Sequence, residues 1–207
     1  MDKIILIGGA PTVGKSELAK HLSKDLNIPW ISCDSVKEIM RKTVRKNDYP
    51  NLFYQPSFAA EKYMNSHTIQ QIIRDQNKEN TDVWKGVKAL IDTDYTWKSF
   101  IVEGVAIIPN LVHRSYRENK KIKTIFLINN DKEWIRKVVF TRGLWADADK
   151  YPDSVKEKEV EWVIEFNEWL KKDAKKYNFP VHDMSYDISG RGINHDDLVK
   201  IGKLLKV

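Results

Sequence analysis

A short segment near the N-terminus combines glycine, lysine and serine at a spacing suited to phosphate chemistry. Residues 9–16 read GAPTVGKS and fit the pattern G-x-x-x-x-G-K-[ST]. Glycines let such a phosphate loop wrap so that its backbone N–H groups point at phosphate oxygens. We expect Lys15 to reach the β- and γ-phosphates of a nucleotide and the Ser16 hydroxyl to bind Mg²⁺. The predicted nucleotide-binding residues here are Gly9, Ala10, Pro11, Thr12, Val13, Gly14, Lys15, Ser16 and Glu17.

The flanking sequence favours this interpretation over a simple glycine turn beside a surface lysine. Residues 3–7 form an uninterrupted apolar run, typical of a strand buried on both faces, and a helical pattern begins at Ser16. A strand before the loop and a helix after it form the context in which this motif binds phosphate. The N-terminus of that helix adds a partial positive charge.

Two carboxylates follow expected strands. Asp34 comes after a strand at 30–33, and Glu103 ends a strand at 99–103. Because ligands of α/β sheets bind at the carboxyl ends of the strands, both side chains are expected near the phosphate loop. Asp34 could accept a proton from a substrate hydroxyl or hold a magnesium-bound water, or it could only cap the next helix. Glu103 could bind magnesium, replace Asp34 as the base, or only bind nearby backbone amides, and Gly104 would let a ligand approach the backbone.

Two arginines lie in a predicted helix that precedes a polar loop at 144–153. A mobile, arginine-bearing segment can neutralise charge on a transferred phosphoryl group and exclude water. Arg142, at the mouth of the loop, is the predicted catalytic arginine. Arg136 is assigned to nucleotide binding, with a place on a solvated helix face as the alternative.

A basic stripe follows Asp34. Lys37, Arg41 and Arg45 are spaced four residues apart, so they share one face of the predicted helix. The stripe predicts an acceptor that bears a phosphate or carboxylate and is bound by Lys37 and chiefly by Arg41, whose planar fork suits such groups. A solvated helix face is the alternative.

The apolar patterns divide the chain into alternating strands and helices. Strands are expected at 3–7, 30–33, 99–103, 122–128 and 179–182. Helices are expected at 16–26, from a capping box at 35–38, at 57–77, at 82–92, from a capping box at 130–133 to 142, from a capping box at 154–157, and near the C-terminus. This alternation predicts an α/β fold with a mainly parallel sheet. Residues 1–207 are expected to form one domain, with a helical acceptor-binding insertion at 46–98 and a lid region at 136–160.

The composition excludes several classes of protein. The net charge of +6 suits anionic ligands, although the basic residues are spread along the chain. An apolar content of 42% excludes disorder, and a single cysteine, Cys33, excludes a disulfide framework and a multi-cysteine zinc site. The five histidines lack metal-ligand spacing. The first apolar run is too short for a signal peptide or a spanning helix, so we expect a cytoplasmic protein with no membrane partner.

Three segments together carry a family resemblance. They are GGAPTVGKSELAKHLS at 8–23, ISCDSVKEIMRK at 31–42 and FIVEGVAIIP at 100–109. They resemble the small P-loop kinases, most closely the 2-phosphoglycerate kinase-like group, except that Ala106 stands where the related motif often has histidine. The resemblance implies the three-layer P-loop NTPase fold with sheet order 2-3-1-4-5, ATP and Mg²⁺ as the donor, a hydroxyl as the acceptor, Asp34 as the base or the group that orients the acceptor, and arginines in a lid.

The predicted function is therefore an ATP-dependent transfer of the γ-phosphoryl group to a hydroxyl of a small, anionic metabolite, such as a phosphorylated acid. The net charge and the aromatic residues of the insertion favour one alternative, a polynucleotide 5′-hydroxyl kinase with nucleic acid as its partner. Antibiotic or nucleotide-sugar phosphotransferases are a further enzymatic alternative. An alternative of another class is a regulatory module that holds ATP without an acceptor.

Overall fold

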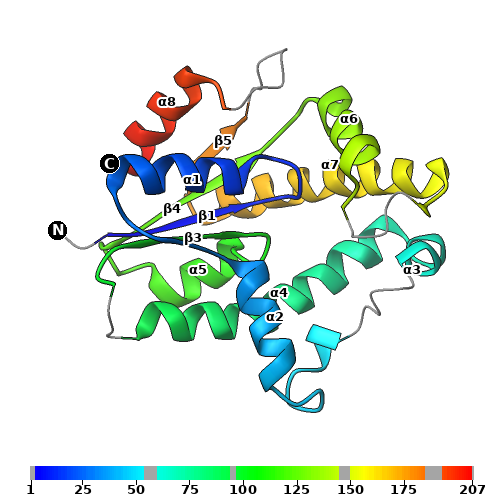
Figure 1. Cartoon of the computed structure of the whole chain (residues 1–207), viewed down its shortest axis with the longest axis horizontal. Helices are drawn as coiled ribbons and strands as arrows, with labels where there is room; N and C mark the ends of the chain where they lie inside the picture. Colours follow the sequence, from blue (N-terminus) through cyan, green and yellow to red (C-terminus); the bar gives the residue numbers. More distant parts are fainter. Residues whose placement is uncertain (1–2, 54–59, 94–96, 145–149, 185–192, 207) are drawn as a thin grey trace.

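Five strands form one parallel sheet (Figure 1). The computed structural model describes residues 3–53, 60–93, 97–144, 150–184 and 193–206. The strands are β1 Ile4–Gly9, β2 Trp30–Ser32, β3 Phe100–Gly104, β4 Ile122–Ile128 and β5 Val181–Asp183. Their order is β2-β3-β1-β4-β5, which confirms the predicted α/β fold and sheet order. The strand bounds lie within two residues of those expected.

Helices cover both faces of this sheet. They are α1 Lys15–Leu26, α2 Cys33–Thr43, α3 Ala60–Ser66, α4 Ile69–Asp92, α5 Pro109–Tyr116, α6 Lys132–Arg142, α7 Asp153–Lys176 and α8 His195–Leu205, with a short 3₁₀ helix, η1, at Pro50–Phe53. In Figure 1, α1 and α8 lie on one side of the sheet, and α4 and α5 lie on the other. The C-terminal half of α7 packs with α4 and α5, because its Leu170 and Ala174 belong to their core cluster. The result is the three-layer arrangement that the family resemblance implies.

The core explains why the strands read as continuous apolar runs. Ile5 and Ile7 of β1 pack in one cluster with Leu18 of α1, whereas Leu6 packs in a second cluster with Val83 of α4. Successive side chains of a strand point to opposite faces. Because helices cover both faces, every position of β1 after Ile4 is buried, and the strand carries no polar alternation.

The start of α2 differs from the expected capping box at 35–38. The helix begins at Cys33, and the Ser32 side chain caps it by accepting a hydrogen bond from the backbone N–H of Asp34 at 3.2 Å. Asp34 therefore lies in the first turn of the helix rather than before it. An acidic side chain is favourable there because it lies near the positive end of the helix dipole.

Other helix boundaries also depart from the expectations. The two helices expected at 57–77 and 82–92 are instead α3 and a continuous α4, which begins with a capping box formed by Thr68 and Gln71. Asp131 rather than Asn130 caps α6, and α7 follows Pro152 with no side-chain cap. The region expected as a helical insertion contains η1, α3 and all of α4.

Several predicted loops fall only partly in the described residues. Residues 54–59, 94–96, 145–149 and 185–192 lie outside them, including parts of the expected insertion, of the lid region and of the loop before α8. Among the helices that the structure does describe, none is both long and apolar enough to cross a membrane.

Candidate active site

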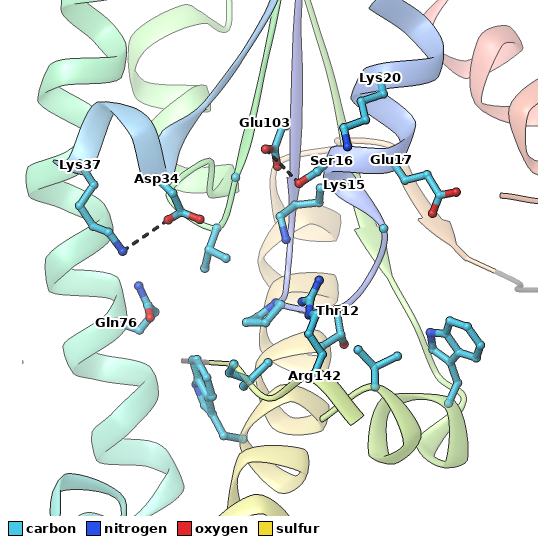
Figure 2. A pocket seen from close by; sticks show the side chains of 18 of the residues that line it. Thr12, Lys15, Ser16, Glu17, Lys20, Asp34, Lys37, Gln76, Glu103 and Arg142 are labelled. Carbon is cyan, nitrogen blue, oxygen red and sulfur yellow. Dashed lines mark hydrogen bonds and ion pairs between the residues drawn. The ribbon is translucent and has the colours of Figure 1, made fainter. Parts of the chain in front are cut away.

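A cavity of about 970 Å³ lies beside the phosphate loop at the carboxyl ends of the strands (Figure 2). Its walls come from the phosphate loop, α1, α2, α4, the end of β3, α6 and α7. The predicted site residues that line it are Pro11, Thr12, Gly14, Lys15, Ser16, Glu17, Asp34, Lys37, Glu103, Gly104 and Arg142. Its volume is at the upper end of ordinary ligand pockets, which measure roughly 300–1,000 Å³. The fold thus brings most of the predicted site together.

The phosphate loop has the local geometry that its sequence predicts. Thr12 and Gly14 have positive φ angles of 70° and 81°, and Gly14 caps the N-terminus of α1. Lys15 is buried, and its ammonium donates a hydrogen bond to the carbonyl of Ala10 at 2.6 Å. Burial lowers the pKa of Lys15, while the nearby carboxylates of Glu103 and Asp34 oppose that shift. The Thr12 hydroxyl is buried and has no hydrogen-bond partner within the described chain, as expected of a loop shaped for a ligand.

The Ser16 hydroxyl is paired with the carboxylate at the end of β3. It donates a hydrogen bond to Oε1 of Glu103 at 3.1 Å, and Glu103 is 2% exposed. A hydroxyl and a carboxylate are the oxygen ligands that Mg²⁺ takes while it keeps waters and binds substrate phosphates. No cluster of three or more His, Cys, Asp or Glu side chains suited to a metal occurs in the described ranges. The residues at this point therefore fit Mg²⁺ bound together with a nucleotide.

The two predicted carboxylates lie in different environments. Glu103 is buried beside Ser16, whereas the Asp34 side chain is 78% exposed and projects into the cavity from α2. The Asp34 side chain forms an ion pair of 3.4 Å with Lys37. Asp34 is thus free to meet a second ligand, while Glu103 is held on the phosphate side.

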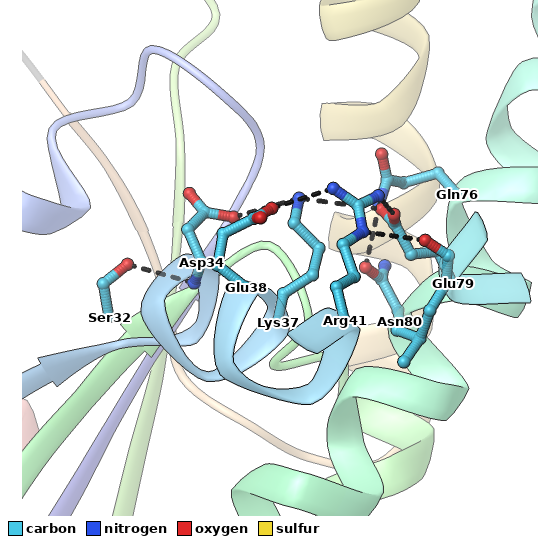
Figure 3. A network of polar contacts seen from close by, with 9 residues as sticks. Ser32, Asp34, Lys37, Glu38, Arg41, Gln76, Glu79 and Asn80 are labelled. Carbon is cyan, nitrogen blue, oxygen red and sulfur yellow. Dashed lines mark hydrogen bonds and ion pairs between the residues drawn. The ribbon is translucent and has the colours of Figure 1, made fainter. Parts of the chain in front are cut away.

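The basic stripe of α2 is largely bound within the protein (Figure 3). Arg41 donates to the carbonyl of Leu52 at 2.8 Å, to Glu38 at 2.8 Å and to Glu79 of α4 at 3.0 Å. Arg41 does not line the cavity, and Arg45 is exposed outside it. Lys37 does line it, between Asp34 and Glu79. The geometry therefore does not support Arg41 as the main anion-binding group, because buried acceptors already occupy its guanidinium.

The two predicted arginines of α6 are placed differently. Arg142 lines the cavity at the end of the helix and points toward the phosphate loop, and its charge contributes to lowering the pKa of Lys15. Arg136 lies outside the cavity, where it forms an ion pair with Glu157 of α7 and packs 4.2 Å from the ring of Phe140. The structure therefore does not place Arg136 with the nucleotide-binding residues.

Gly104 is required by the packing of α2 against β3. Its φ is +153°, and a Cβ atom there would lie 2.5 Å from Cβ of Cys33. Cys33 is fully buried, and burial together with Glu103 and Asp34 raises the pKa of its thiol well above its usual value. We expected a ligand to lie close to the backbone of Gly104, but the Cys33 side chain occupies that space. Gly104 also borders the cavity.

Several residues that line the cavity were not among the predicted site residues. They are Lys20, His21, Glu38, Gln76, Val105, Trp134, Val138, Leu144 and Trp162. Lys20 follows Ser16 by four residues, so helical spacing could have identified it. His21, one of the five histidines that lack metal-ligand spacing, also lines the cavity. Gln76 comes from α4, and no motif or spacing signals its position.

Sequence comparison finds relatives named 2-phosphoglycerate kinase. The protein of Methanocaldococcus jannaschii is 30% identical over 180 residues, which cover 86% of this chain and 57% of that relative. The protein of Methanococcus vannielii is 28% identical over 188 residues, with 86% and 58% covered. These matches confirm the resemblance to that group, and the chain spans a little under three fifths of the relatives' length. No protein-family model matches the chain.

Structural comparison shows the fold. A gluconokinase from Sinorhizobium meliloti 1021 aligns with a TM-score of 0.54 at 12% identity, covering 99% of this chain and 94% of its own. Shikimate kinase from Bacteroides thetaiotaomicron aligns with a TM-score of 0.54 at 14% identity, covering 99% of each chain. The chain has the P-loop kinase fold. In this fold the phosphate loop at 9–16 lies between β1 and α1, where nucleotide phosphates bind at a helix N-terminus.

Proposed function

We propose that the protein is an ATP-dependent kinase that transfers the γ-phosphoryl group to a hydroxyl of a small, anionic metabolite. One observation carries this proposal: a single cavity has a phosphate-binding side, with Lys15 and the Ser16–Glu103 pair, and an exposed carboxylate, Asp34, on its other side. A module that only holds a nucleotide needs the first side alone. The kinase names of the relatives and of the structural neighbours support the same conclusion.

The phosphate side would bind and polarise ATP. The loop backbone and Lys15 bind the β- and γ-phosphates, with the Lys15 ammonium exchanging the carbonyl of Ala10 for a phosphate oxygen. Ser16 and Glu103 would hold Mg²⁺, which supplies positive charge to the phosphate oxygens when it is bound. Arg142 adds a second positive charge where the transferred group carries its negative charge.

The transfer itself needs one proton acceptor. The oxygen of the acceptor hydroxyl attacks the γ-phosphorus while the bond to the β–γ bridging oxygen breaks, and ADP leaves. Asp34 is suited to take the hydroxyl proton because it is exposed to the cavity, whereas Ser16 engages Glu103. The rest of the rate enhancement comes from positioning and from electrostatic stabilisation.

The charge of the cavity favours a small acceptor over a polynucleotide. The described lining holds four basic side chains and four acidic ones: Lys15, Lys20, Lys37 and Arg142, and Glu17, Asp34, Glu38 and Glu103. A polynucleotide site needs an excess of positive charge along its path, because phosphate contacts dominate its affinity. The excess positive charge of the chain therefore lies outside the cavity lining. The relatives are called 2-phosphoglycerate kinases, so 2-phosphoglycerate is the first acceptor to test.

An ADP-release assay tests this proposal. ATP and Mg²⁺ are supplied with 2-phosphoglycerate, and then with a panel of other phosphorylated acids, sugar acids, nucleosides and 5′-hydroxyl oligonucleotides. We expect acceptor-dependent ADP release that Lys15→Ala nearly abolishes, with an unchanged far-UV circular dichroism spectrum. Lys24→Ala, an exposed position on the same helix, is the matched control. ADP release that no hydroxyl compound stimulates, or that survives Lys15→Ala, would contradict the proposal.

A further inference from the structure

The α4 side of the cavity presents a hydrogen-bonding group that the proposed chemistry does not use. Gln76 lines the cavity, and its amide nitrogen donates to Oε2 of Glu79 and to Oδ1 of Asn80, both at 3.0 Å (Figure 3). The carbonyl oxygen of Gln76 accepts no hydrogen bond from the residues that the structure describes. A fixed amide nitrogen thus leaves a carbonyl oxygen available to a ligand.

The neighbours of Gln76 determine which way its amide faces. The Glu79 carboxylate offers only acceptors, and its other oxygen already accepts from Arg41 at 3.0 Å. Asn80 donates through Nδ2 to Asn77 at 3.3 Å, so its oxygen is the atom that faces Gln76. A flipped Gln76 amide would set oxygen against two oxygens. Glu79 and Asn80 are 3% and 1% exposed, so water cannot readily relieve such a conflict.

Of the two cations beside this carbonyl, Arg41 is engaged through all three guanidinium nitrogens, whereas Lys37 is held only by longer ion pairs. Arg41 is held by the carbonyl of Leu52 and by Glu38 and Glu79, and Lys37 lies 3.4 Å from Asp34 and 4.0 Å from Glu79. The wall formed by α2 and α4 therefore offers hydrogen-bond acceptors and one ammonium, whose charge two carboxylates share. Hydroxyl donors fit such a wall, whereas a doubly charged phosphate would face more negative than positive groups.

We infer that Gln76 determines acceptor specificity by accepting a hydrogen bond from a second hydroxyl of the acceptor, in addition to the hydroxyl that is phosphorylated. This inference rests on the proposed function and narrows it. The acceptor class is a polyhydroxylated acid with a single carboxylate, which Lys37 binds, rather than a phosphate ester with one hydroxyl. The inferred acceptor of this chain thus differs from 2-phosphoglycerate, the compound in the name of its relatives.

Matched acceptors test the inference in the wild-type protein. On a three-carbon skeleton, glycerate, 3-hydroxypropionate and 2-phosphoglycerate carry a hydroxyl, a hydrogen and a phosphate at the second carbon. Sugar acids of four to six carbons and their singly deoxygenated counterparts extend the series. We expect the hydroxylated member of at least one pair to have a kcat/KM about threefold to tenfold higher, the effect of one neutral hydrogen bond. This comparison needs no variant.

A variant then assigns the preference to Gln76. Gln76→Leu should remove the preference for the extra hydroxyl while the KM for ATP changes by less than about twofold, because the residue would contact the acceptor alone. Gln70→Leu, at an exposed position of the same helix, should keep it. Thermal unfolding of both variants checks that the fold is retained.

The outcomes separate this inference from the proposed function. Lys15-dependent transfer to 2-phosphoglycerate or 3-hydroxypropionate that equals or exceeds transfer to the polyhydroxylated acids would overturn the inference and leave the kinase proposal intact. A hydroxyl preference that persists in Gln76→Leu would overturn the role of this residue. The absence of transfer to every hydroxyl compound would overturn the kinase proposal, and the inference with it.

Discussion

The two sides of the cavity are built in different ways. The phosphate side is centred on a loop of eight consecutive residues, whose geometry depends on backbone angles at Thr12 and Gly14 and on a contact between Lys15 and Ala10. Glu103 and Arg142 reach this loop from β3 and α6. The acceptor side joins α2 to α4 through Arg41 and Glu79, which are 38 positions apart in the sequence. The phosphate loop is therefore a local structure, whereas the acceptor side exists only after two helices pack together.

Charged residues therefore have different roles on the two sides of the cavity. Lys15 is predicted to bind phosphate because the motif itself places its ammonium inside the loop. Arg41 has an equally suitable side chain and spacing, but it stabilises the packing of α2, η1 and α4 instead. The same residue chemistry is thus proposed to bind a ligand on one side and stabilises the fold on the other.

The largest expected effect comes from breaking the acceptor side alone. Asp34→Asn should lower kcat by about 10²-fold to 10⁴-fold, because the hydroxyl proton loses its acceptor. The KM for ATP should stay within about twofold, since the phosphate side is unchanged. Steady-state ADP release measures both constants. If Glu103→Gln shows this pattern and Asp34→Asn does not, the roles of the two carboxylates must be exchanged.

The next effect concerns the phosphate side. Arg142→Ala should lower kcat by about 10²-fold, because the substitution removes a positive charge that lies near Lys15 and the transferred group. The circular dichroism spectrum should not change, since Arg142 is exposed at the end of α6. A variant with wild-type kcat would show that Lys15 and the bound metal supply all the positive charge that the transfer needs.

A stability measurement sharpens the contrast between Lys15 and Arg41. Arg41→Ala should lower the free energy of unfolding by about 2–3 kcal/mol, because it leaves the buried Glu79 carboxylate without its main partner. Urea denaturation measures this change. Arg45→Ala, at an exposed position just after the end of α2, should stay within about 0.5 kcal/mol of the wild type. Unchanged stability with a strongly raised acceptor KM would instead assign Arg41 to anion binding.

The smallest effect is expected at Arg136. Its ion pair with Glu157 is solvent-exposed and lies outside the cavity, so Arg136→Ala should leave kcat and the KM for ATP within about twofold of the wild type. The same ADP-release assay measures it beside Arg142→Ala. A rise in the KM for ATP well beyond that range would restore the nucleotide-binding role that the sequence suggested.

The sequence alone determined the parts of the molecule that depend on near neighbours. The apolar run at 3–7, the glycines of the phosphate loop and the helix from Ser16 predict β1, the loop and α1, because strand periodicity and loop geometry are set within a few residues. Asp34 and Glu103 were predicted to lie at the site because parallel strands present their carboxyl ends at one edge of the sheet. Resemblance to a known family added the order of the strands.

The tertiary structure alone decided how the acceptor side is made. Arg41 and Gln76 face Glu79 from two helices, so the first is occupied, and the second lines the cavity with its amide nitrogen engaged by Glu79. The space above Gly104 is filled by Cys33, and Arg136 pairs with Glu157 across two helices. Charge and helical spacing in one segment give no information on which groups another segment brings within hydrogen-bonding distance. The packing of the helices settles which polar groups remain available to a ligand.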